Sequence, residues 1–116
     1  MRLRERDKRD VTVAACTGFD DDVYLFGEGE TIRAGVFPNT RAIDVQIYGE
    51  RVRETRLMLY DGADGKEVTL EAGMGVSLDG DVPAYRIKSV EGRAHQTAVL
   101  ELIPEGRRGR GRNDER

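Results

Sequence analysis

The side chains of this 116-residue chain most able to do chemistry are its single histidine and its single cysteine. His95 lies between Arg93 and Thr97 in a stretch with turn character, which predicts an ordinary surface histidine. Cys16 ends an alternating apolar segment with small neighbours, which predicts a small buried or half-buried side chain rather than a nucleophile. A catalytic site needs a positioned acid, base, nucleophile or metal. We therefore expect no catalytic residues and no enzymatic activity.

Acidic clusters raise the question of a bound cation. Residues 20–22 are three consecutive aspartates, Asp61 is near Asp64, and Asp79 is near Asp81. None of these clusters has the ligand spacing of a helix-loop-helix calcium site, and aspartate beside glycine is typical of turns. A single cysteine forms no internal disulfide and supplies too few soft ligands for zinc. The sequence predicts no metal site and no cofactor.

Alternating apolar residues predict the elements that make up the fold. Short β-branched or apolar runs recur every 8–12 residues or so, with turn residues rich in Gly and Asp between them. This spacing predicts an all-β fold, a small β-barrel or sandwich-like barrel of about six to nine strands with a long connecting loop and disordered termini. The segment 41–54 is the exception, because Arg51, Arg53 and Glu54 interrupt the alternation and allow it to be partly helical. The expected strands are 11–15, 23–26, 31–37, 43–47, 56–60, 68–70, 74–78, 85–90 and 97–103.

Charge divides the chain into three parts. Residues 11–104 carry 9 basic and 16 acidic side chains, a net charge of −7, while residues 1–10 and 105–116 each carry +2. We expect a single β-barrel domain at 11–104, a basic N-terminal arm at 1–10 and a disordered Arg/Gly-rich tail at 105–116. The arms are either solvated or in contact with an acidic partner or a DNA backbone. Their candidate contact residues are Arg2, Arg4, Arg6, Arg107, Arg108 and Arg110.

Hydropathy gives no sign of a membrane segment. No apolar run approaches the roughly 20 residues that cross a bilayer, and no apolar segment follows the first basic residues as it would in a signal peptide. We expect no membrane partner.

A series of short motifs extends through most of the chain. They are the opening Met1-Arg2-Leu3-Arg4-Glu5-Arg6-Asp7 before Val11-Thr12-Val13, then Ala34-Gly35-Val36-Phe37-Pro38, Tyr48-Gly49-Glu50-Arg51-Val52, Leu57-Met58-Leu59-Tyr60-Asp61-Gly62, Gly73-Met74-Gly75-Val76, Tyr85-Arg86-Ile87-Lys88-Ser89-Val90 and Ala98-Val99-Leu100-Glu101-Leu102. The order of these motifs resembles that of the phage head-tail joining proteins, also called head closure or stopper proteins. The resemblance covers roughly residues 1–104.

The resemblance implies a virion structural protein of a phage or prophage. Such a subunit would be made in the host bacterial cytoplasm and assemble as a homo-oligomeric ring on the portal or adaptor connector in the virion neck. The ring would close the DNA-filled head and offer a docking platform to tail proteins. An acidic body suits a channel wall that must not hold DNA. The Arg-Gly tail would support at most a weak, non-specific contact with a DNA backbone.

Two other functions stay open. A tail-tube or other tail subunit has a similar small β-fold, and would be distinguished by indefinite polymerisation. A small ligand-binding β-barrel needs an apolar cavity, which a chain with seven aromatic residues is poorly equipped to line.

The long connection near 39–55 is the candidate contact segment. Tyr48 has a ring that could anchor an interface, and Gly49 has a backbone that could flex. The alternative is that residues 43–48 form another core strand. The candidate partner-interface residues are Tyr48, Gly49, Glu50, Arg51 and Arg53.

Overall fold

The computed structural model describes residues 4–66, 68–78 and 82–110. The strands in these ranges are β1 (Arg9–Asp20), β2 (Val23–Pro38), β3 (Thr55–Tyr60), β4 (Gly75–Ser77), β5 (Tyr85–Glu91), β6 (Gln96–Leu102) and β7 (Arg108–Arg110). The helical elements are α1 (Ala42–Tyr48) and the 3₁₀ turns η1 (Glu5–Asp7), η2 (Gly49–Glu54) and η3 (Glu105–Arg107).

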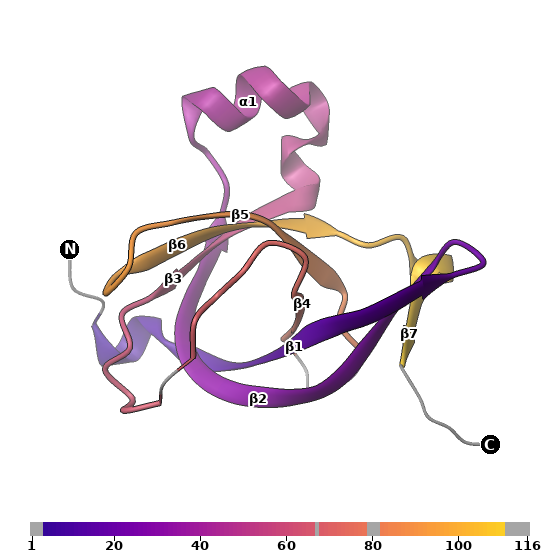
Figure 1. Cartoon of the computed structure of the whole chain (residues 1–116). Coiled ribbons are helices and arrows are strands. Elements are labelled where there is room, and N and C mark those ends of the chain that lie inside the picture. The colour runs from indigo at the N-terminus through magenta and orange to yellow at the C-terminus, as the bar shows by residue number, and fades with distance from the viewer. Residues whose placement is uncertain (1–3, 67, 79–81, 111–116) are drawn as a thin grey trace.

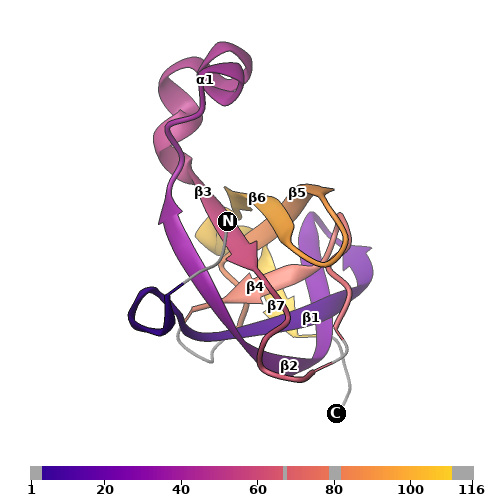
Figure 2. The same ribbon diagram turned by 90° about the vertical axis from the view of Figure 1, so that its left-hand side faces the viewer.

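Six antiparallel strands close into a small barrel. Their order is β1-β4-β5-β6-β3-β2, and the pairing of β1 with β2 completes the ring. β7 is added outside this ring, parallel to β2. Figures 1 and 2 show the barrel with α1 standing clear of it. The predicted small β-barrel is confirmed.

The barrel interior is filled by apolar side chains from alternate strand positions. Buried residues from the strands and one loop form one cluster: Val11, Val13, Ile32, Ala34, Met58, Tyr60, Leu70, Val76, Ile87, Ala98 and Leu100. In β5 the register shifts between Ile87 and Ser89, so Val90 packs against the core while Ser89 is exposed. The bulge reverses the alternation that the sequence predicts for this strand.

β1 and β2 form one long hairpin rather than three short strands. β2 extends over 16 residues and joins the predicted strands 23–26 and 31–37. Asp21 and Asp22 have φ angles of 51° and 65°, the pattern of a type I′ hairpin turn. The aspartates of residues 20–22 therefore make the turn. Cys16 lies beyond the barrel in the distal hairpin and is exposed, so the prediction that it is at least half-buried is wrong.

Two other predicted strands are absent from the described residues. Residues 43–47 lie in α1, whose anchoring is described below. Residues 68–70 are irregular, because the backbone N–H of Leu70 donates to the side-chain Oε1 of Gln96 (2.9 Å) instead of to a neighbouring strand.

Several segments share the outer edge of β2. β3 pairs only with Gly35–Pro38, at the C-terminal end of the strand. Farther along, the N–H of Arg33 donates to Asp64 Oδ2 (3.0 Å) and Lys66 Nζ donates to the carbonyl of Thr31. The loop after β3 thus supplies partners for an edge that would otherwise be open.

Asp64 makes the stability of the barrel depend on pH. Burial raises the pKa of Asp64, but hydrogen bonds from the N–H groups of Arg33 and Lys66 and from the Tyr60 hydroxyl outweigh it, so the pKa lies below its ordinary value. A lowered folded-state pKa contributes stability above the unfolded value, near 3.9, and this stability is lost as the pH falls through the folded value.

We expect Asp64→Asn to lower the denaturation midpoint at pH 7 and to flatten its decline below about pH 4. The measurement is the urea midpoint as a function of pH. Asp22→Asn, which makes the same charge change in the exposed turn, is the control and should keep the wild-type profile. An unchanged profile for Asp64→Asn would contradict the role of this carboxylate.

Both predicted arms are partly folded in the described residues. The side chains of Lys8 and Asp61 are each only 6% exposed and pair at 3.2 Å, and Glu5 of η1 pairs with Arg33 (3.0 Å). At the other terminus, residues 105–110 form η3 and β7 instead of a disordered tail. The tail lacks apolar residues, but main-chain pairing with β2 does not require them. Residues 111–116 and Arg2 lie outside the described residues.

Candidate partner interface

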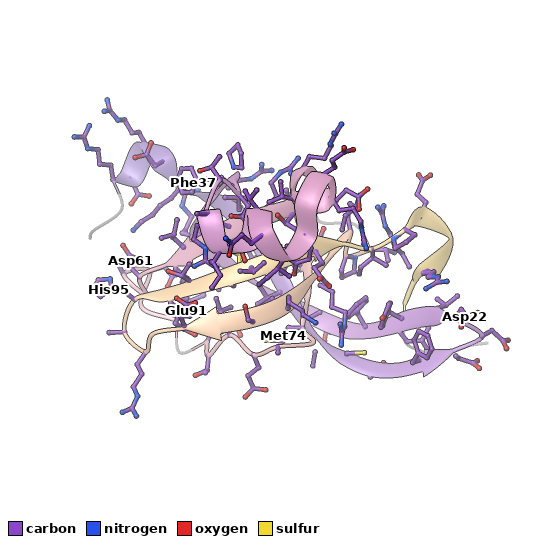
Figure 3. All side chains as sticks on the ribbon, turned by 90° about the horizontal axis from the view of Figure 1, so that it is seen from above. Asp22, Phe37, Asp61, Met74, Glu91 and His95 are labelled. Carbon is purple, nitrogen blue, oxygen red and sulfur yellow. The ribbon has the colours of Figure 1, made fainter. Side chains whose placement is uncertain are left out.

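The segment between β2 and β3 forms a helical protrusion, defined here as α1 and η2 (residues 42–54). Figures 1 and 2 show it projecting away from the barrel. Viewed from above in Figure 3, it lies between the end of the barrel marked by Asp61 and His95 and the end marked by Asp22. The long connection predicted near 39–55 is this protrusion.

A polar cluster holds the base of the protrusion. Asp44, in the first turn of α1, is only 4% exposed, and its Oδ2 accepts from Arg41 Nε (2.7 Å) and Asn39 Nδ2 (3.1 Å). The Asn39 side chain is also buried, and its Oδ1 accepts from the N–H of Arg41 (3.1 Å). Arg41 in turn lies 3.7 Å from Glu91 of β5. The Asp44 carboxylate raises the pKa of Arg41 and so favours the charged pair.

α1 has the reverse of the usual amphipathic pattern. Asp44 and Tyr48, four residues apart and therefore on one helix face, are its buried and half-buried residues. Ile43 and Ile47, also four apart, are 61% and 68% exposed, and Val45 is 44% exposed. A helix normally turns its apolar side inward. Ile43 and Ile47 share one helix face and form what we call the α1 ridge, whereas Val45 lies on the other side of the helix from them.

These aliphatic residues overturn the alternative that 43–48 is a core strand. They were not among the predicted interface residues, because their period-two spacing is that of a strand. The paired i, i+4 spacings of Ile43 with Ile47 and of Asp44 with Tyr48 were the signal in the sequence that could have identified a helix.

Tyr48 fastens the helix to the barrel. Its hydroxyl donates to Glu101 Oε2 of β6 (2.7 Å), and the ring is half-buried. Burial and then the bond to Glu101 raise the pKa of Tyr48 to about 12, so the hydroxyl keeps its proton at neutral pH. Tyr48 therefore positions the protrusion, and its ring is less available to a partner than the sequence suggests.

Gly49 ends α1. Its φ and ψ of 60° and −133° strongly favour glycine, and its N–H donates to the carbonyl of Val45. Nothing lies within 4 Å of where a Cβ would stand. The backbone conformation, rather than the space around it, accounts for a glycine here.

The charged candidates gather on η2 beside Tyr48 and Gly49. Glu50, Arg51 and Arg53 are all exposed. Arg51 pairs with Glu54 (3.5 Å), and Arg53 Nε donates to the carbonyl of Glu50 (3.2 Å). An exposed pair of this kind contributes little to stability. These groups form a charged border next to the α1 ridge.

The basic arms lie away from this site. Arg4 and Arg6 are exposed around η1, which lies at the opposite end of the barrel from β7 (Figure 1). At the β7 end Arg107 is exposed, while Arg108 is half-buried and donates from Nε to the carbonyl of Ile103 (2.8 Å). Arg110 is the last residue of β7. The two arms are thus separate charged regions, not one patch.

Neither residue weighed for catalysis is part of a constellation. His95 is exposed in the turn before β6, and Cys16 Sγ lies 3.4 Å from the carbonyl of Gly18. In residues 4–66, 68–78 and 82–110, no group of three or more His, Cys, Asp or Glu side chains is placed to hold a metal ion. In the same ranges, no helix has the length and apolar character to cross a membrane.

Comparison with known proteins gives no assignment, since no family model, no curated protein and no solved structure matches this chain.

Proposed function

We propose that this protein is a phage virion structural subunit that joins head to tail. It would assemble as a ring on the portal or adaptor connector, close the DNA-filled head and offer a platform to tail proteins. The order of the sequence motifs supports the head-tail joining part of the proposal. The observation that carries its binding part is the α1 ridge, two neighbouring isoleucine side chains held outward on a helix whose Asp44 and Tyr48 face the barrel.

The α1 ridge favours a protein partner because a partner that covers it removes apolar surface from contact with water. Burying one isoleucine side chain contributes about 1.5–3 kcal/mol. Asp44, Asn39 and Arg41 hold the base of the helix, so little order has to be imposed when a partner binds. A rigid apolar ridge with a charged border has the anatomy of a protein interface.

The barrel itself supports a structural role over small-molecule binding. Its interior is occupied by packed core side chains. A hollow of about 360 Å³ between Arg9, Tyr85, Leu102 and Arg108 opens at the surface, outside this core. The acidic balance of residues 11–104 suits a wall beside DNA that must not hold it.

The test is a stop codon early in the gene of the strain that carries it, followed by induction and electron microscopy of released particles. We expect tailless heads that lose their DNA, and recovery of tailed particles when the wild-type gene is supplied in trans. Heads that keep their DNA but lack tails would favour the tail-subunit alternative. Normal tailed particles from the disrupted strain, or no particles from the parent strain, would refute a role in the virion.

The same complementation tests the interface. We expect Ile47→Asp to reduce the yield of tailed particles at least about tenfold, because the buried apolar contact is replaced by a charge that the partner must desolvate. Gln46→Asp, an exposed neighbour on the same helix, should complement like wild type. Equal yields from the two variants, with both folded, would remove the α1 ridge from the interface.

A further inference from the structure

The outer edge of β2 near the hairpin turn is filled by the chain's own C-terminal segment. β7 pairs in parallel with Tyr24–Phe26, the one parallel pairing among the described strands. β3 covers the same edge only at Gly35–Pro38, and Asp64 and Lys66 cover it at Arg33 and Thr31. Without β7, the edge at residues 24–26 would have no strand beside it.

The contact is built for a strand with glycine at its centre. A Cβ on Gly109 would stand 2.8 Å from Val23 Cγ1 and 3.2 Å from Leu25 Cδ2, both closer than ordinary packing allows. Arg108 and Arg110 flank this glycine. The hairpin beside them has five acidic and no basic residues between Val11 and Ile32. The close fit favours a glycine at the centre of the added strand, and the acidic hairpin gives a basic segment a general complement in charge.

The segment is also only lightly attached to the rest of the fold. Arg108 and Gly109 do not belong to the buried core, and η3, which joins β7 to the barrel, has no buried residue. After buried Ile103, the connection 104–107 is exposed throughout. Removing β7 from the edge of β2 therefore empties no part of the core.

We propose that the edge of β2 at Tyr24–Phe26 is a strand-acceptor site, and that the Arg108–Arg110 segment of a second copy can replace the chain's own. Identical segments make identical main-chain bonds, so exchange between copies leaves the pairing energy unchanged. The chain's own segment has the advantage of an effective concentration on the order of millimolar. Exchange therefore becomes significant where copies are concentrated.

Gly109→Val in the full-length chain is the variant expected to open the site, because its side chain would crowd Val23 and Leu25 and force the strand or these side chains to shift. Gly106→Val is the matched control, since nothing lies within 4 Å of a Cβ at that position. The probe is a capped, fluorescein-labelled peptide with the sequence of residues 105–110. We expect it to bind Gly109→Val at least about tenfold more tightly than wild type or Gly106→Val, in which the chain's own segment competes.

Two further measurements decide the remaining points. Amide NMR shifts on peptide binding should centre on residues 23–26, and a peptide of the same composition in scrambled order should not bind.

Exchange between copies is tested by sedimentation up to about 1 mM. Wild type and Gly106→Val should form a concentration-dependent dimer that Gly109→Val lacks. Equal binding of the scrambled peptide, or no preference for Gly109→Val, would refute the acceptor site. A wild type that stays monomeric, or a Gly109→Val dimer as strong as that of wild type, would refute exchange between copies.

Discussion

Leu100→Ala is expected to lower the free energy of unfolding by about 2–5 kcal/mol, the largest effect of any substitution considered. Leu100 is completely buried in the barrel and lies within β6. It is paired with Ile87 of β5 on one side and with Arg56 of β3 on the other. The shortened side chain would leave a cavity that a closed ring of strands cannot easily collapse to fill.

Leu102→Ala is the matched control for this prediction. Leu102 lies two positions later on the same strand but is 40% exposed, so the same substitution should cost no more than about 1 kcal/mol. Urea denaturation of both variants and wild type gives the comparison. An equal loss of unfolding free energy in the two variants would contradict the burial of Leu100 and the exposure of Leu102 in the structure.

Asp44→Ala is expected to lower stability by about 2–3 kcal/mol and to loosen the helical protrusion before the barrel unfolds. The substitution takes the acceptor away from Asn39, which is buried, and from the guanidinium of Arg41. Polar groups left without partners in a buried site cost the full penalty of their desolvation. Among the residues that the structure describes, the Tyr48–Glu101 bond would then be the remaining side-chain hydrogen bond between α1 and the barrel.

Hydrogen exchange followed residue by residue is the decisive measurement for Asp44→Ala. Amides of residues 42–54 should lose protection, while those of β5 and β6 keep most of theirs. Glu50→Ala removes the same charge from an exposed position of the protrusion and should change stability by less than about 0.5 kcal/mol. Unchanged protection in Asp44→Ala would show that the polar cluster does not hold the helix.

The loosened variant also bears on function. If the protrusion is disordered before binding, ordering it costs free energy, and this cost reduces the net binding free energy. Asp44→Ala should therefore weaken partner binding even though Asp44 is buried and touches no partner. Ile47→Asp, in contrast, should weaken binding while leaving amide protection in the protrusion unchanged.

The β-barrel was predictable because alternation records which face of a strand is buried. Val11 and Val13, or Ala98 and Leu100, are apolar at every second position, and the structure buries each pair. The hairpin turn was also present locally, since aspartate tolerates the positive φ values found at Asp21 and Asp22. These features need only information from neighbouring residues.

The structure of the tail and of the protrusion could not be predicted without knowledge of the whole fold. β7 has no apolar pattern, and it is ordered because β3 leaves part of the edge of β2 open. Nothing in the composition of an Arg-Gly segment shows that a strand edge is available to it. The edge is available because β2 is longer than its neighbour β3, which pairs only with Gly35–Pro38.

The sequence by itself determined an all-β barrel with a long insertion between two strands, because the alternation of buried and exposed side chains is written in the order of residues. Only the tertiary structure decided that 42–48 is a helix and which side of it faces outward. Ile43, Val45 and Ile47 suit a strand by their spacing, and a segment this short satisfies either period. The choice is made by Asn39 and Arg41, which bind Asp44, and by Glu101, 53 positions from Tyr48 along the chain. Those contacts turn Asp44 and Tyr48 inward and leave Ile43 and Ile47 exposed on another face of the helix.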